Sequence, residues 1–259
     1  MPSRTASLLV SALILIGLCR IVLSYSDTAQ GFDEPAHVAC GIEWLDRGTY
    51  GLDPLHPPLS RVLIGIPLYF AGARLPEVPP RGSNPAPFWT VGNQLLNGGG
   101  HYSRNLALAR SGVLPFFILA SLVVYFWARL NYGDLAALLA VALFSSTPVV
   151  LAFSSLEYTD FPAAATQLLA LFAFARWLET RNTRWALGLG VAVGLAILSK
   201  FTSLLFLPVA GLAMALCKLG LPGIVPEIIR DSMGTSNDPD REHRRGAGLE
   251  RLQIRYRPG

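Results

Sequence analysis

The feature that most constrains this chain is a series of six apolar runs whose lengths approach the thickness of a lipid bilayer. A helix needs about 20 apolar residues to cross the hydrocarbon core, where every backbone polar group must be satisfied within the protein. The pattern therefore predicts an all-α protein, a polytopic membrane helix bundle of about six spans. The predicted spans are 8–25, 106–128, 134–153, 161–178, 185–199 and 201–217.

Composition agrees with this fold class. Hydrophobic residues make up 52% of the chain and charged residues 15%, against about 25% in a typical globular protein. So few charged groups cannot cover a water-facing surface, and the same numbers exclude a disordered chain, a collagen-like repeat and a coiled coil. The net charge of +4 is spread along the chain, which argues against a nucleic-acid partner. The three cysteines are scattered and predict neither a disulfide framework nor a metal site.

Basic residues near the ends of the runs predict an orientation in the plasma or inner membrane. Cytoplasmic loops carry an excess of Lys and Arg. With a cytoplasmic N-terminus, the flanking basic residues fall on the inner side: Arg4, Arg129, Arg176, Arg181, Arg184 and Lys218. The long loop 26–105 then lies outside. An alternative stays open for the first run, which could be a cleaved signal peptide ending near Ser24-Tyr25-Ser26.

The end of the chain differs from the rest. Residues 221–259 hold 13 of the 38 charged residues, and their apolar residues are sparse and aperiodic. We therefore expect a membrane domain over 1–220, followed by a charged, disordered cytoplasmic tail. Within the membrane domain, Gly188, Gly190 and Gly194 predict close helix packing in the fifth run.

Two short helices are predicted in the outer loop, both lying at the membrane interface. The first begins at Pro35, with Glu34 near its N-cap and apolar residues recurring at helical spacing. The second begins after His56. Its predicted apolar face is formed by Leu59, Val62, Leu63 and Ile66. His56 then stands at a helix N-terminus, where free N–H groups and the helix dipole favour an anion such as phosphate.

Ionisable residues from several of these elements converge at the outer face of the membrane. Asp33 and Glu34 precede the first short helix, and His56 precedes the second. Asp160 directly precedes the fourth run, and Lys200 separates the last two. Such convergence suggests a site. Structural interpretations stay open, because the acids can cap helices, the histidine can belong to a turn, and the lysine can snorkel to the interface.

The order of these motifs resembles that of GT-C glycosyltransferases that use polyprenyl-phosphate sugars, in particular the protein O-mannosyltransferase-like and aminoarabinose-transferase-like branches. The matching motifs are Asp33-Glu34, His56-Pro57-Pro58-Leu59, Asp160 before a run, and Ser199-Lys200-Phe201-Thr202. Together they cover roughly residues 5–215. The resemblance implies a membrane enzyme that moves a sugar from a lipid-linked donor to an acceptor at the outer face, with inversion of the anomeric centre.

The resemblance also implies roles for the two adjacent acids. Asp33 would be the catalytic base for the acceptor hydroxyl, and Glu34 would be a second acid of the catalytic site. The acceptor is a protein, a lipid or a glycan, and membrane lipids are the surrounding partners. Trp44, Trp89 and Tyr50 are equally well interpreted as interfacial anchors and as platforms for a sugar ring.

Other residues would handle the donor phosphate. His56, Lys200 and Arg104 would bind it and stabilise its departing charge. Arg110 is a weaker candidate for the same role. Asp160 would orient His56, Lys200 or the acceptor.

The chain also departs from the family pattern, since family members are usually longer and carry more spans. We therefore expect a truncated or split member, with a second polypeptide supplying the missing C-terminal half. No cofactor is expected, because lipid-phosphate sugars need none on chemical grounds, and a divalent metal ion is left open. Two other functions also stay open: a non-catalytic membrane scaffold or degenerate transferase subunit, and a transporter component.

Overall fold

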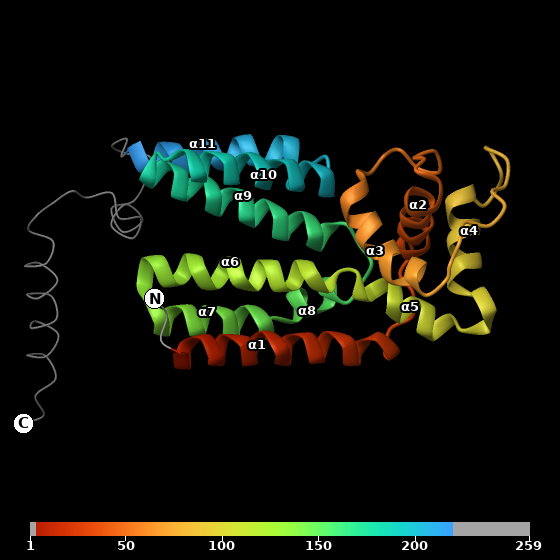
Figure 1. Cartoon of the computed structure of the whole chain (residues 1–259), viewed down its shortest axis with the longest axis horizontal. Helices are drawn as coiled ribbons and strands as arrows, with labels where there is room; N and C mark the ends of the chain where they lie inside the picture. Colours follow the sequence, from red (N-terminus) through yellow and green to blue (C-terminus); the bar gives the residue numbers. More distant parts are fainter. Residues whose placement is uncertain (1–3, 220–259) are drawn as a thin grey trace, which may run out of the picture. The chain divides into compact units, whose positions relative to one another are not determined.

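The computed structural model describes residues 4–219 of the chain, and the predicted tail at 221–259 lies outside them (Figure 1). The described residues form helices and loops without any strand, which confirms the predicted fold class. The helices are α1 (Arg4–Leu23), η1 (Ser24–Ser26), α2 (Glu34–Arg47), α3 (Pro58–Phe70), α4 (Pro87–Leu96), η2 (Gly98–Gly100), α5 (Tyr102–Ser111), α6 (Leu114–Tyr132), α7 (Asp134–Ser146), α8 (Pro148–Ser154), α9 (Asp160–Thr180), α10 (Thr183–Ser199) and α11 (Ser203–Leu219). The chain divides into two units, Met1–Gly211 and Leu212–Gly259, and the first holds every candidate site residue.

Several helices are long and apolar enough to cross a membrane. Among the described residues, three such helical stretches occur: Arg4–Ser26, Tyr102–Tyr132 and Asp160–Thr180. A fourth would be α7 and α8 together, which are bent by 61°. The bend lies where Thr147 is extended before Pro148, as expected for the residue before a proline. These helices make the chain an integral membrane protein. The predicted number of crossings stays a prediction, because α10 and α11 have only 17 residues each.

Within Met1–Gly211, α9 packs against α10 and α6, α6 packs against α7, and α7 packs against α1. Phe117 on α6 stacks on Phe144 of α7, and a side chain at Gly17 of α1 would meet the Phe117 ring. Apolar side chains such as Leu8 and Leu135 point away from this packing and are exposed, as lipid-facing residues are. Among residues 4–219 the predicted glycine packing in the fifth run does not occur, because none of them lies within 4 Å of a Cβ built at Gly188, Gly190 or Gly194.

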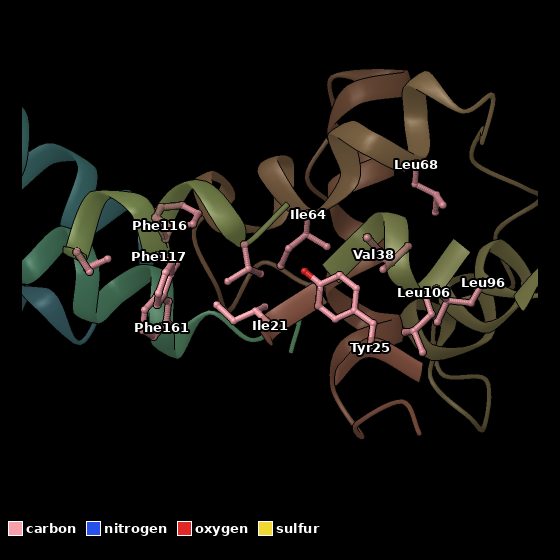
Figure 2. Packing of buried hydrophobic residues seen from close by; sticks show 14 of the residues in the cluster. Ile21, Tyr25, Val38, Ile64, Leu68, Leu96, Leu106, Phe116, Phe117 and Phe161 are labelled. Carbon is pink, nitrogen blue, oxygen red and sulfur yellow. The ribbon is translucent and has the colours of Figure 1, made fainter. Parts of the chain in front are cut away.

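The long loop 26–105 is folded into packed helices rather than extended over the surface. Figure 1 shows α2, α3 and α4 together at one end of the long helices of this unit. The contacts are close at glycines: a Cβ at Gly41 would lie 2.0 Å from the carbonyl oxygen of Arg61, and one at Gly92 would lie 1.9 Å from that of Pro35. Figure 2 shows one continuous apolar cluster that runs from Phe117 in the long helices to Leu96 in this segment.

Both short helices begin close to the predicted positions, α2 at Glu34 beside Pro35 and α3 at Pro58. In α2, every residue of Glu34–Glu43 is buried, so the helix is enclosed on all sides along this stretch. In α3, the buried residues are Ser60, Arg61, Ile64, Gly65 and Leu68. The residues of the predicted apolar face are partly buried, and two of them, Leu59 and Leu63, pack against the apolar core. The most buried face of α3 carries Arg61, because polar partners for the guanidinium lie inside the protein.

Candidate functional site

Four segments far apart in sequence meet where α3 approaches the ends of α9 and α10. The Ser60 hydroxyl donates to the carbonyl oxygen of Ser199 at 3.3 Å, which joins the start of α3 to the end of α10. The ammonium of Lys200 donates to Asp160 Oδ1, which joins the residue after α10 to the start of α9. Gly31 packs on Tyr158, since a Cβ at this glycine would lie 2.1 Å from the phenol oxygen. The segments before α2, α3 and α9 and the α10–α11 junction therefore share one region.

Asp33 lies at the start of α2 with an exposed side chain. It occupies the N-cap position, yet its carboxylate makes no capping hydrogen bond. No hydrogen bond or ion pair joins this carboxylate to any residue that the structure describes. Burial raises the pKa of the Tyr158 phenol, and the carboxylates of Glu34, Asp33 and Asp160 raise it further. The charges of Asp33 and Asp160 therefore both act on Tyr158, and the cap interpretation of Asp33 has no support.

Glu34, the next residue, is fully buried and fully paired. Arg110 Nε and Nη2 donate to its two carboxylate oxygens, each at 3.0 Å. The backbone N–H groups of Gly31 and Glu157 donate to the same carboxylate. The rest of the Arg110 guanidinium donates to the backbone carbonyl oxygens of Tyr25, Thr28 and Ala29. These contacts fix the segment that carries Asp33, while the predicted catalytic role of Glu34 stays a prediction.

Glu157 is a buried acid beside this pair that the sequence analysis did not select. Its two carboxyl oxygens are buried and have no hydrogen-bond partner among the described residues. Burial raises the pKa of Glu157 well above its usual value, and the charge of Glu34 raises it further. Burial therefore favours the protonated form of this carboxyl group. Its signal in the sequence was weak, because an acid in a short polar turn ordinarily faces water.

A second buried network surrounds Arg61 and joins it to His37 and Asp53. Arg61 Nε lies 3.2 Å from His37 Nδ1, and its Nη1 donates to the carbonyl oxygen of Asp53 at 2.7 Å. Its Nη2 donates to the Asp53 carboxylate. Burial lowers the pKa of His37 to about 3, and the charge of Arg61 contributes to this shift, so His37 is neutral. A lone arginine within an apolar helix was the sequence signal for this network.

His56 stands at the edge of this network. Its ring packs edge-on against the His37 ring at 5.6 Å, and its Nδ1 lies 3.6 Å from Asp53 Oδ2. Burial and the charge of Arg61 lower the pKa of His56, and the charge of Lys200 lowers it as well. The charge of Lys200 therefore acts on His56, although it is the smallest of these influences. Of the predicted phosphate-binding residues, His56 and Lys200 belong to segments that the Ser60–Ser199 hydrogen bond joins.

Arg104, by contrast, is not near them. It is exposed on α5 and lines a different cavity of about 370 Å³, together with Arg74 and His101. Arg110 is buried, and its N–H groups already donate to Glu34 and to backbone carbonyl groups. Within residues 4–219, no group of three or more His, Cys, Asp or Glu side chains is arranged to hold a metal ion.

A helical membrane bundle with ionisable side chains gathered at one end is the arrangement expected of a GT-C type membrane glycosyltransferase. A family model of dolichyl-phosphate-mannose-protein mannosyltransferases matches residues 108–221, a segment that includes Asp160 and Lys200 but neither Asp33 nor His56. The match covers less than half of the chain and shows similarity to this family over that segment. No curated protein and no solved structure matches the chain.

Proposed function

We propose that the chain transfers a sugar from a polyprenyl-phosphate donor to an acceptor hydroxyl at the outer membrane face, with Asp33 as the general base. One observation carries the proposal: the exposed Asp33 carboxylate, which pairs with no described residue, belongs to the region where the segments of His56 and of the Lys200–Asp160 pair meet. A base must be free to approach the acceptor, and the Asp33 side chain is exposed and makes no capping hydrogen bond.

The neighbouring residues support this role by holding Asp33 in place. The Glu34–Arg110 pair is buried and anchors the segment before α2 through backbone carbonyl groups. A buried bidentate pair has a defined geometry, which limits the movement of the adjacent residue. Glu34 and Arg110 therefore act as positioning residues, and Asp33 is the group that contacts the acceptor.

Lys200 and His56 are proposed to bind the donor phosphate. Lys200 brings a positive charge, and Asp160 holds its ammonium group through a hydrogen bond. His56 is neutral in the free protein because burial and Arg61 lower its pKa. A bound phosphate would favour protonation of His56, since an anion raises the pKa of a nearby imidazole. The two residues then stabilise the charge that develops on the leaving group.

The proposed reaction is a single displacement. The acceptor oxygen attacks the anomeric carbon as its proton passes to Asp33. The bond from that carbon to the phosphate oxygen breaks, and its electron pair leaves with the polyprenyl phosphate. Lys200 and His56 interact with that phosphate, and the anomeric configuration is inverted.

The test is sugar transfer by the purified chain in lipid nanodiscs, supplied with polyprenyl-phosphate sugars. Removing a general base typically costs about 10²–10⁴-fold in rate, so we expect Asp33→Asn to lower turnover by that factor. The matched control is Asp27→Asn, another exposed aspartate six residues earlier. Equal turnover in wild type and Asp33→Asn would contradict the role of Asp33. A folded, inserted chain that neither transfers nor hydrolyses the donor would contradict the proposed activity and favour the scaffold.

A further inference from the structure

A cavity of about 530 Å³ lies beside the segment that carries Asp33. Its volume falls within the roughly 300–1,000 Å³ of small-molecule sites. The lining comes from the residues before α2, from the start of α2, from the loop before α4, and from α4 itself. These side chains are Gln30, Phe32, Pro35, Pro85, Trp89 and Asn93. Asp33 directly follows Phe32, so the proposed base stands between two lining residues in the sequence.

Two aromatic side chains give the cavity an apolar surface. Phe32 is 73% exposed, and its ring meets Trp89 edge-on at 4.5 Å. Phe88 contacts Trp89 at 5.0 Å, which holds the indole in place. The indole N–H of Trp89 is buried and has no hydrogen-bond partner among the described residues. A large exposed aromatic beside an unsatisfied indole donor is the pattern of a surface that a ligand covers.

Two amide side chains give the cavity a fixed set of polar groups. Gln30 Nε2 donates to Asn93 Oδ1 at 2.9 Å, and the Tyr102 hydroxyl donates to Gln30 Oε1 at 3.1 Å. Asn93 Nδ2 donates to the backbone oxygen of Trp89 at 2.9 Å. Each amide carries two N–H donors and an oxygen with two lone pairs. Both therefore keep donor and acceptor capacity for a ligand after these contacts are made.

None of the side chains that line this cavity is charged. The site therefore differs from the Lys200 and His56 region, which suits an anion. An aromatic surface with fixed neutral amides suits a neutral polyhydroxylated ring: its C–H face packs on the aromatics and its hydroxyl groups bond to the amides. We infer that this cavity binds the acceptor and that the acceptor is a carbohydrate. The inference rests on the proposed function, because it assigns the second substrate of the same site.

The test measures binding directly, without requiring transfer. Methyl glycosides of neutral hexoses and of N-acetylhexosamines are titrated against the full chain in nanodiscs. Saturation-transfer NMR detects their binding. We expect Trp89→Ala and Asn93→Ala to weaken binding about tenfold or more, as the loss of one buried hydrogen bond or ring contact implies. The control Trp44→Ala removes an exposed tryptophan that does not line the cavity and should leave affinity unchanged. Phe32→Ala removes an exposed ring, so this variant tests the cavity without disturbing the packing of the protein.

The outcomes separate this inference from the proposed function. Sugar binding that survives Asp33→Asn and is lost in Trp89→Ala supports the inference, even if the chain transfers no sugar. Absence of glycoside binding overturns it, as does binding that Trp89→Ala, Asn93→Ala and Phe32→Ala all leave intact. The chain could also transfer sugar to serine-containing peptides at a rate that none of these three variants changes. That result would overturn the inference of a carbohydrate acceptor and would still support the proposed transferase activity.

Discussion

The segment between α1 and α6 and the long helices of the bundle are held together by different kinds of contact. The long helices pack mainly through apolar side chains, as Phe117 on Phe144 illustrates. The segment at their end packs around two buried arginines and through glycine contacts with backbone atoms. A bundle in lipid needs only apolar residues and internal hydrogen bonds, whereas a folded segment carrying a polar site must also satisfy the charges that it buries.

The largest expected effect tests the buried ion pair. Arg110→Met leaves the Glu34 carboxylate buried without its partner, next to the buried Glu157. Breaking a buried pair in this way costs about 3–5 kcal/mol. We expect a lower melting temperature in detergent micelles and faster hydrogen exchange over residues 25–34. Arg104→Met is the matched control, because that arginine is exposed on the same helix. Unchanged exchange in Arg110→Met would show that the pair does not hold the segment.

A smaller effect compares glycines in the two regions. In Gly92→Ala the new methyl group collides with the backbone of Pro35, and such overpacking costs about 1–3 kcal/mol. In Gly188→Ala the methyl group meets nothing within 4 Å, and alanine favours the helix by about 0.5–1 kcal/mol. We therefore expect opposite shifts in melting temperature. Shifts of the same sign would mean that the two regions do not differ in how closely they pack at these glycines.

The smallest effect is the pH dependence of stability, to which two buried groups contribute with opposite signs. The folded protein keeps Glu157 protonated above its ordinary pKa of 4.5, so this group lowers stability as the pH rises from there. His37 stays neutral down to a pKa of about 3, so this group lowers stability as the pH falls below its ordinary value of 6.5. We expect Glu157→Gln to raise the melting temperature at pH 8 and to leave the loss at low pH unchanged.

The control for that measurement is Glu77→Gln, which changes an exposed glutamate in the loop between α3 and α4. It should leave the whole profile unchanged. A profile for Glu157→Gln that matches the wild type across the range would show that the buried carboxyl group is ionised in the folded protein.

Sequence patterns predicted the fold class well and the details of the candidate site only in part. Apolar runs located most of the long helices, and prolines located the starts of α2 and α3, because both signals act within a few residues. The bend at Thr147 and the break between α5 and α6 were missed, since hydropathy alone does not register them. The burial of Arg61 on α3 was not predicted, because its partners are supplied by α2 and the preceding loop.

The sequence by itself determined that this protein is a helical membrane bundle with acids, a histidine and a lysine near the ends of its helices. Tertiary structure decided how these groups differ. Asp33 and Glu34 are adjacent and chemically similar, yet one is exposed and unpaired while the other is buried against Arg110. Hydropathy is a local property that each segment carries alone. The environment of a carboxylate depends on partners far away in the chain, and Arg110 lies 76 residues from Glu34.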